Sequence, residues 1–107
     1  MPWATLCELS DLPDGQGKPV DIDGHRLAVF RDGPTVAALD NTCPHAGVAL
    51  SGGTVEAGCA VCPAHQWAFE LSTGHLRGTP AVSVRRYPTR LLDFAGKRFV
   101  QADLPGT

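Results

Sequence analysis

The sequence lacks the features of a membrane protein or a nucleic-acid-binding protein. No apolar run approaches the roughly 20 residues that a membrane-spanning helix needs. No run of Lys or Arg occurs, and a formal net charge of −2 leaves no basic surface for nucleic acid. The residues Met1 to Thr5 contain no basic region followed by an apolar stretch, so we expect no signal peptide. We therefore predict a cytoplasmic protein with neither a membrane nor a nucleic-acid partner.

Cysteine is also scarce, with four in 107 residues. Four cysteines can form two disulfides in a secreted chain. In a reducing compartment, cysteines that lie near histidines are more often metal ligands. The length suits a single folding unit, and we expect one domain over residues 1–107. Metal binding is therefore the expected role of some of these cysteines.

Long helical periodicity is missing as well. The 12 glycines and 9 prolines instead interrupt short runs of β-branched and aromatic residues, a pattern typical of an all-β domain. Asp23-Gly24 and Ala95-Gly96 predict tight hairpin turns. The expected strands are Pro19–Ile22, His25–Arg31, Thr35–Leu39, Thr54–Glu56, Cys59–Val61, Trp67–Leu71, Val82–Tyr87, Thr89–Phe94 and Lys97–Gln101.

We predict an antiparallel β-sandwich with a small subdomain, at about residues 41–71, that is formed by two polar loops. Trp67 and Phe69 alternate along a strand and are expected to pack in the core beside these loops. The residues from Leu104 to the end are expected to fray. The other core candidates are Trp3, Phe30, Tyr87, Phe94 and Phe99, together with the small side chains of Cys7 and Cys59.

The two loops carry the residues with the most informative chemistry. One reads Cys43-Pro44-His45 and the other Cys62-Pro63-Ala64-His65, with sixteen residues between His45 and Cys62. Each loop thus offers one thiolate and one imidazole. Loops rich in Gly and Pro can also point backbone N–H groups at a buried anion, which a metal–sulfide cluster requires. The four residues together predict a metal centre.

This pair of motifs, C-x-H followed by C-x-x-H, resembles the Rieske [2Fe–2S] family. The resemblance extends over nearly the whole chain, from the strands at 24–39 to the hairpin at Gly96. It implies a Rieske-like fold and one [2Fe–2S] cluster. Cys43 and Cys62 would bind one iron, and His45 and His65 the other. Gly78-Thr79-Pro80 is similar to the proline loop that covers the cluster in this family.

The resemblance also implies a position on the scale of reduction potentials. Rieske centres lie between roughly −150 and +300 mV, against about −400 mV for plant-type ferredoxins. Members with high potentials have an extra disulfide between the loops and a serine hydroxyl near a bridging sulfide. At the matching positions this chain has Val48, Ala64 and Trp67. We therefore predict a potential at the low end of the range.

Other interpretations of these residues remain open. A Cys₂His₂ set also binds structural zinc, although zinc fingers usually pair cysteine with cysteine and histidine with histidine. Cys59 and Cys62 form a C-x-x-C motif, but no βαβ pattern surrounds them as in thiol–disulfide enzymes. We interpret His25 and His75 as surface or turn residues. Arg85 and Arg86 could meet an acidic partner, but we favour a solvated face for them.

The sequence predicts a monomeric one-electron carrier that is not itself an enzyme. It is similar to the ferredoxin components of bacterial dioxygenase systems, which implies electron transport from a flavoprotein reductase to a terminal oxygenase. An alternative is a small Rieske-type subunit that serves the large subunit of an assimilatory nitrite reductase. A zinc-stabilised interaction module is a further alternative. An oxygenase itself needs a mononuclear iron site in a large catalytic domain, for which 107 residues leave no room.

Overall fold

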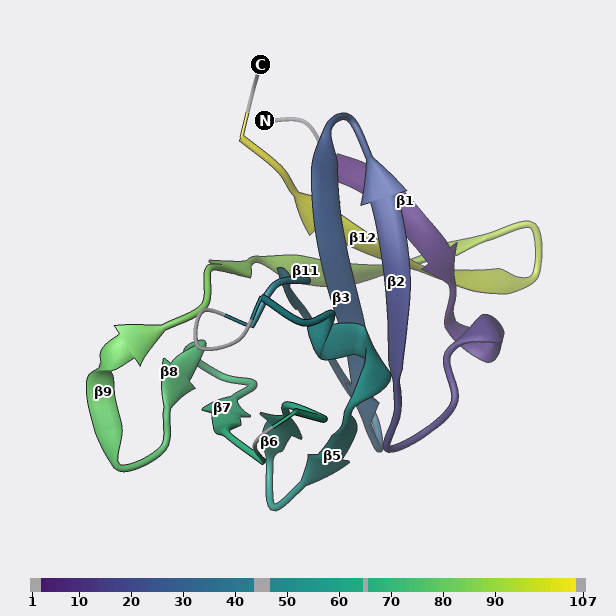
Figure 1. Cartoon of the computed structure of the whole chain (residues 1–107). Helices are drawn as coiled ribbons and strands as arrows, with labels where there is room; N and C mark the ends of the chain where they lie inside the picture. The colour runs from purple at the N-terminus through teal and green to yellow at the C-terminus, as the bar shows by residue number, and fades with distance from the viewer. Residues whose placement is uncertain (1–2, 44–46, 65, 106–107) are drawn as a thin grey trace.

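The computed structural model describes residues 3–43, 47–64 and 66–105, which fold almost entirely into β-strands (Figure 1). The prediction of an all-β, antiparallel protein is confirmed. The strands are β1 (Trp3–Glu8), β2 (Gly17–Ile22), β3 (His25–Asp32), β4 (Thr35–Asp40), β5 (Thr54–Glu56), β6 (Cys59–Val61), β7 (Ala68–Glu70), β8 (His75–Leu76), β9 (Thr79–Ser83), β10 (Arg86–Tyr87), β11 (Thr89–Phe94) and β12 (Lys97–Asp103).

The strands form three sheets. The first has the order β1-β12-β11, the second β10-β4-β3-β2 and the third β5-β6-β7-β8-β9. Two short 3-10 helices, η1 (Leu9–Asp11) and η2 (Leu50–Gly52), lie between strands. In the described part of the chain, no helix is long and apolar enough to cross a membrane. The third sheet continues to Ser83, past the predicted end of the loop subdomain at residue 71.

The second sheet is the central layer, because both of its faces are buried. Ala28, Phe30 and Leu39 pack toward η2, the third sheet and the two loops. The alternate side chains Leu27 and Val29 belong to the clusters shared with the first sheet. This double burial explains why β3 and β4 read as nearly continuous apolar runs rather than as alternating ones. One face of the central sheet therefore supports the loops, while the first sheet covers the other.

The predicted tight turns are confirmed. Asp23 and Gly24 have φ values of 50° and 80°, and Ala95 and Gly96 have values of 54° and 79°. Two successive positive φ angles are typical of the two-residue turn that joins twisted antiparallel strands. Ala57 and Gly58 form a third turn of the same kind between β5 and β6.

Several expectations about packing were wrong. Phe94 is 70% exposed, because the tip of the β11–β12 hairpin extends beyond the end of β1, whose pairing with β12 stops at Phe99. Figure 1 shows this hairpin projecting from the body of the molecule. Leu104 does not fray but is buried beside Leu27 and Tyr87. Cys7 is only half-buried.

The segment that was expected to be a proline loop is largely a strand. Thr79 and Pro80 begin β9, which pairs with β8. Because β9 lies at the edge of the third sheet, the missing N–H of Pro80 costs no hydrogen bond to a further strand. The expected strand Trp67–Leu71 is shorter than predicted and consists of Ala68–Glu70. Trp3–Glu8 is a strand that we did not predict.

Candidate metal centre

Two of the predicted ligands, Cys43 and Cys62, are fully buried in the same hydrophobic cluster. Cys43 follows the end of β4, and Cys62 follows the end of β6 directly. Both pack in the cluster that contains the large buried side chains of Phe30 and Phe69. The fold thus brings two thiols, nineteen positions apart in the sequence, into one apolar environment.

The first loop, residues 43–48, is closed by two backbone hydrogen bonds. The N–H of Cys43 donates to the carbonyl oxygen of Val48 at 2.9 Å, and the N–H of Gly47 donates to the carbonyl oxygen of Cys43 at 2.8 Å. Gly47 has a φ of 68°, in the left-handed region that glycine adopts without strain. Cys43 is therefore held close to both Gly47 and Val48.

The second loop, residues 62–67, repeats this pattern at equivalent positions. The N–H of Cys62 donates to the carbonyl oxygen of Trp67 at 2.7 Å, and the N–H of Gln66 donates to that of Cys62 at 3.0 Å. Gln66 has a φ of 63°, so the same left-handed position is occupied here by a residue with a side chain. Each cysteine thus bonds to the fourth and fifth residues after it, and the two loops match in these hydrogen bonds and in the left-handed residue at the fourth position.

Further contacts anchor the start of the first loop to η2 and to the central sheet. The Asn41 side-chain oxygen accepts from the N–H of Ser51 at 2.7 Å, which ties the start of the loop to η2. The Tyr87 hydroxyl donates to Asp40 Oδ1 at 2.6 Å. Together these bonds fix the two residues at positions 40 and 41, just before Cys43.

A close backbone contact joins the two loop regions. A Cβ atom on Gly53 would collide with the carbonyl oxygen of Val61, the residue before Cys62. Gly52, its neighbour, has only an ordinary contact with the ring of Pro63, at 3.7 Å from its Cβ position. The absence of a side chain at Gly53 therefore allows the chain leaving the first loop to lie against the strand that leads into the second.

The predicted ligands His45 and His65 lie outside the described residues, so the complete ligand set remains a prediction. Among the described residues alone, no three His, Cys, Asp or Glu side chains gather as a metal site. The two buried cysteines fit a group that takes two thiolates on one iron, because an apolar shell around thiolate ligands is what tunes such a centre.

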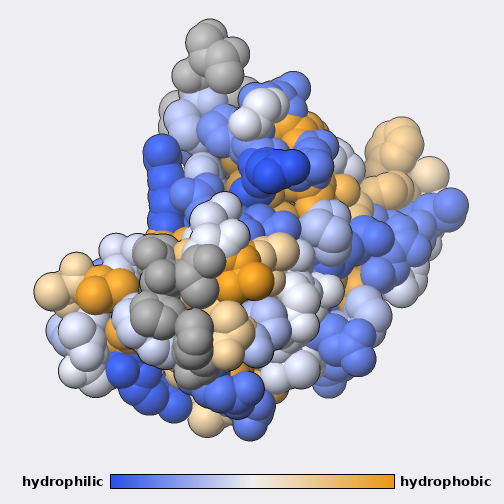
Figure 2. Space-filling view, in the orientation of Figure 1, coloured by the Kyte–Doolittle hydropathy of each residue, from blue (hydrophilic) through white to orange (hydrophobic). Residues whose placement is uncertain are grey.

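The positions expected to tune the potential lie close to the loops. Val48 is 36% exposed, Ala64 is exposed, and Trp67 is half-buried against the cluster that contains both cysteines. Phe69 is fully buried, which confirms its predicted place in the core. Figure 2 shows apolar residues at the surface on the part of the molecule that carries the loops. A partner that covers this surface would bury apolar area.

The thiol of Cys59 does not have the character of a redox-active C-x-x-C motif. Its side chain is fully buried, as predicted, and burial raises the pKa of this thiol. Burial also raises the pKa of the Cys7 thiol, against the opposing charge of Lys18. A reactive thiol needs a lowered pKa, so neither cysteine fits that role.

The remaining residues singled out in the sequence do not join the candidate centre. His75 is exposed in β8, as expected. His25 begins β3 and is half-buried, with its ring edge against Tyr87 at a centroid distance of 5.8 Å, so it is more than a surface residue. Arg85 and Arg86 are exposed, and the Nε of Arg86 donates to the carbonyl oxygen of Leu71 at 2.8 Å.

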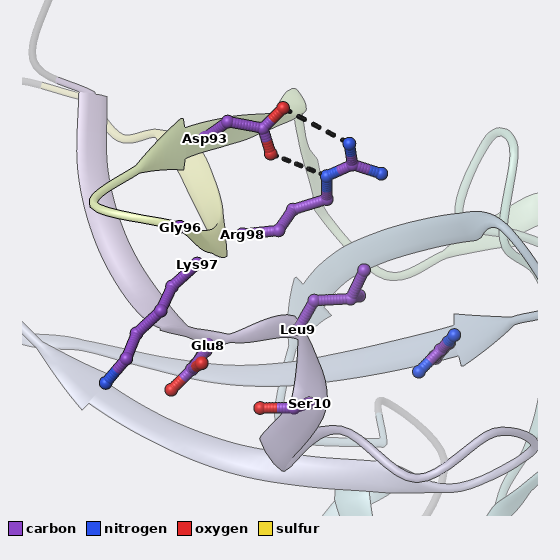
Figure 3. A pocket seen from close by; sticks show the side chains of 8 residues that line it. Glu8, Leu9, Ser10, Asp93, Gly96, Lys97 and Arg98 are labelled. Atoms are coloured by element: carbon purple, nitrogen blue, oxygen red, sulfur yellow. Dashed lines mark hydrogen bonds and ion pairs between the residues drawn. The ribbon is translucent and has the colours of Figure 1, made fainter.

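A cavity of about 700 Å³ lies away from the two loops, between η1 and the β11–β12 hairpin (Figure 3). Arg98, one of its cations, forms two hydrogen bonds with Asp93, at 2.6 and 3.2 Å. This exposed pair lowers the pKa of the Asp93 carboxyl group, mainly through the hydrogen bond. No cysteine lines this cavity, and we assign it no part in the metal centre.

Sequence reasoning missed the residues that hold the loops in place. Asn41, Asp40 and Tyr87 act through hydrogen bonds between segments that are distant in the chain, and no local pattern reveals these bonds. The left-handed Gly47 could have been found, because glycine four residues after a motif cysteine favours such a turn. Gln66 gives no comparable signal.

Comparison with known proteins gives a consistent result. The family model for the Rieske [2Fe-2S] domain matches residues 2–88. The ferredoxin component of the naphthalene 1,2-dioxygenase/salicylate 5-hydroxylase systems of Ralstonia sp is 30% identical over 90 residues, which cover 83% of this chain and 86% of that protein. Mouse apoptosis-inducing factor 3 is 32% identical over 89 residues, but these cover only 15% of that longer protein. Among solved structures, a putative NADH-dependent nitrite reductase small subunit from Mycobacterium tuberculosis is similar at a TM-score of 0.84, with 30% identity and coverage of 98% of this chain and 97% of that one.

Proposed function

This chain belongs to the Rieske [2Fe–2S] domain family and holds one [2Fe–2S] cluster, and we propose that it passes single electrons from a flavoprotein reductase to a terminal oxygenase. When bound, the cluster supplies a centre that is reduced and reoxidised by one electron. In our proposal Cys43 and Cys62 ligate one iron. His45 and His65 ligate the other, and the cluster-binding subdomain is built on residues 41–71 and the rest of the third sheet.

The observation that best supports this ligand set is the matched pair of loops. Each begins at a fully buried cysteine and closes through the same two backbone hydrogen bonds. In each loop the predicted histidine lies, in the sequence, between the cysteine and the residue at positive φ. Two equivalent loops, each with one thiol and one imidazole, suit a centre whose two irons take unlike ligand pairs.

The residues around the loops favour a low potential. Val48 and Ala64 offer no thiol for a disulfide, and Trp67 offers no hydroxyl group at the position of the serine in high-potential members. Fewer hydrogen bonds to the cluster leave more negative charge on it, which makes reduction harder. A low potential suits delivery of electrons to an oxygenase rather than oxidation of a quinol.

The partners are proposed from the similarity to a known ferredoxin component. The Ralstonia protein is a component of dioxygenase and hydroxylase systems, and this chain is similar to it over most of both sequences. We propose no catalytic residue, because a carrier alters no substrate. Thiolate ligands suit the reducing cytoplasm, where we place the protein, and we propose that it works as a monomer.

A second function is favoured by the structural comparison. The similarity to the nitrite reductase small subunit covers nearly the whole of both chains. The same cluster would then deliver electrons to a nitrite reductase large subunit. Reconstitution of the purified protein with each partner separates the two proposals. The oxygenase proposal requires that the cluster deliver electrons to a Rieske oxygenase and that the protein form no stable complex with a nitrite reductase.

The first test of the proposed ligands is EPR spectroscopy of the anaerobically purified protein after reduction with dithionite. We expect a rhombic signal distinct from that of an all-cysteine [2Fe–2S] cluster. The variant His65→Cys replaces a neutral imidazole with a thiolate, and we expect its potential to fall toward that of plant-type ferredoxins, about −400 mV. A colourless protein with stoichiometric zinc, or a His65→Cys variant with an unchanged potential, would refute the proposal.

A further inference from the structure

A second cavity, of about 330 Å³, lies beside the start of the first loop. Three segments that are distant in the chain meet there. They are the start of β3 with His25 and Arg26, the end of β4 with Asp40 and Thr42, and the link between β9 and β10 at residues 83–85. Because Thr42 directly precedes Cys43, the cavity borders the candidate metal centre without including its proposed ligands.

The lining of this cavity carries a local excess of positive charge. Arg26 and Arg85 contribute two guanidinium groups, whereas Asp40 is the sole carboxylate in the lining. Asp40 already accepts a hydrogen bond from Tyr87, at 2.6 Å. In the described part of the chain, the one ion pair is Arg98 with Asp93, so neither guanidinium of the cavity is paired with Asp40.

The two guanidinium groups retain their donors. The Arg85 guanidinium carbon lies 5.1 Å from the centre of the Tyr87 ring, and this stacking restricts its position while leaving its N–H groups available. Arg26 of β3 lies opposite Asp21 of β2, and the two side chains form no ion pair or hydrogen bond. Five N–H donors on each guanidinium group match the geometry of a carboxylate.

A third feature, beneath the lining, is an unsatisfied nitrogen. The His25 Nε2 atom is buried and has no hydrogen-bond partner among the described residues. A buried polar nitrogen of this kind is uncommon, and a small shift of the His25 ring would let it reach a ligand held by the two arginines. The hydroxyl groups of Thr42 and Ser83 add two further donors to the same cavity.

We propose that this cavity binds a carboxylate group through Arg26 and Arg85, with the imidazole of His25 at its side. The carboxylate comes either from a small free acid or from an Asp or Glu side chain of a redox partner. The second source rests on the proposed function, because a partner that approaches the loops would also cover this cavity. The ion pair between the two arginines and the partner's carboxylate would then fix the orientation of the partner beside the cluster.

Ligand-observed NMR tests the binding with two named probes. One is acetate, with neutral acetamide as its control. The other is the capped peptide acetyl-Gly-Glu-Gly-amide, with its Gln counterpart as control. The oxidised holoprotein is used throughout at constant ionic strength. We expect saturation transfer to acetate but not to acetamide, and at least a twofold loss of transfer in Arg26→Gln and in Arg85→Gln.

The matched control is Lys97→Gln, which removes an exposed cation from the other cavity. Equal loss of transfer in this variant, or unchanged transfer in both arginine variants, would overturn the proposal. Binding of acetate and the Glu peptide supports a partner side chain as the source, whereas binding of acetate alone supports a free acid. Absence of binding by both overturns the proposed site.

Measurements on the reduced protein distinguish failure of the proposed carboxylate site from failure of the proposed cluster ligands. A carboxylate beside a reduced, paramagnetic cluster should show faster relaxation of the acetate methyl protons than in the oxidised protein. Acetate that binds without this enhancement, in a protein that lacks the EPR signal, would refute the cluster ligands but not the cavity. A protein with the EPR signal but no acetate binding would refute the cavity alone.

Discussion

The two loops of the candidate metal centre share their closing backbone hydrogen bonds and one left-handed position, but different residues occupy that position. Gly47 occupies the left-handed position of the first loop, and Gln66 occupies that of the second. A residue with a side chain is strained in this region, whereas glycine is not. Equivalent geometry at unequal conformational cost indicates that the turn itself is required, whichever residue is present.

The loops also differ in how they are anchored. The first is fixed by side chains, through the Asn41–Ser51 and Tyr87–Asp40 hydrogen bonds. The second follows directly from β6, which lies against the backbone of Gly53 and pairs with β7. Side-chain anchors can be removed without a change in the backbone, so the two loops should respond differently to substitution.

The largest effect is expected from substitution of either proposed cysteine ligand. Cys43→Ser and Cys62→Ser each take one thiolate from the proposed centre, and we expect essentially complete loss of the cluster in both. The measurement is the iron and sulfide content together with the visible spectrum. Cys59→Ala is the control, because this buried cysteine is not a proposed ligand and should leave the iron content unchanged. Retention of the cluster in one serine variant would show that the loops are not equivalent.

The second prediction concerns the backbone contact of the second loop. Gly53→Ala places a methyl group against the carbonyl oxygen of Val61, and we expect the free energy of unfolding to fall by about 1–3 kcal/mol. Gly52→Ala is a matched control, because its new methyl group meets only the Pro63 ring at an ordinary distance of 3.7 Å. Urea titration followed by circular dichroism measures both. Equal midpoints would contradict a role for this contact.

The third prediction is that a rise in pH weakens the anchor of the first loop at the Tyr87–Asp40 hydrogen bond. Burial, followed by the hydrogen bond to Asp40, raises the pKa of Tyr87 to about 12. The folded state therefore favours the neutral phenol, so its contribution is fully present below pH ~10 and is lost as the pH rises through ~12. We expect a loss of about 1 kcal/mol at pH ~11 relative to pH ~9.

Urea titrations between these pH values measure this loss, and Tyr87→Phe removes the titrating group. The variant should be less stable at neutral pH by about 1 kcal/mol, because it lacks the hydrogen bond to Asp40. Its stability should change less with alkaline pH than that of the wild type. An equally steep alkaline loss in the variant would assign the effect to another group.

The smallest effects on the free energy of unfolding are expected from substitutions at the two left-handed positions, Gly47 and Gln66. Gly47→Ala should lower the free energy of unfolding by about 1 kcal/mol, since alanine is strained at a φ of 68° although no atom lies within 4 Å of its Cβ. Gln66→Gly should leave stability unchanged or raise it by up to about 1 kcal/mol, because relief of strain is offset by greater freedom in the unfolded chain. Urea midpoints give both values, and an opposite order would contradict the comparison.

The sequence predicted most of the local structure. The turns at Asp23-Gly24 and Ala95-Gly96 depend on two neighbouring residues and are confirmed. The strands Thr54–Glu56, Cys59–Val61 and Thr89–Phe94 have the predicted bounds. Each is delimited by residues that favour turns, so the signal for it is local.

The errors concern features that depend on distant residues. Trp3–Glu8 is a strand because it pairs with β12, and nothing within the first residues reveals that partner. Leu104 is buried by side chains from β3 and β10, and Phe94 is exposed because no third strand reaches the hairpin tip. Thr79 and Pro80 form an edge strand, where the usual argument against proline does not apply.

For the candidate centre, the sequence identified the cysteines but not their supports. The motif spacing pointed to Cys43 and Cys62, which the structure buries in one cluster. The histidines of the same motifs remain a prediction. Asn41, Tyr87 and Gly53 act through the positions of other segments, which are known only once the sheets have formed.

The pairing of β1 with β12 has a consequence for the order of folding. It places Trp3 opposite Asp103, so this ladder closes a loop of nearly the whole chain. Contacts between residues so far apart form late, because the entropy of loop closure must be overcome first. The neighbouring hairpins of the third sheet need no such closure and can form early. The central sheet that supports both cysteines is covered on its far side only when β12 has been synthesised and β1 has joined it. We therefore expect cluster loading to be a late step in maturation.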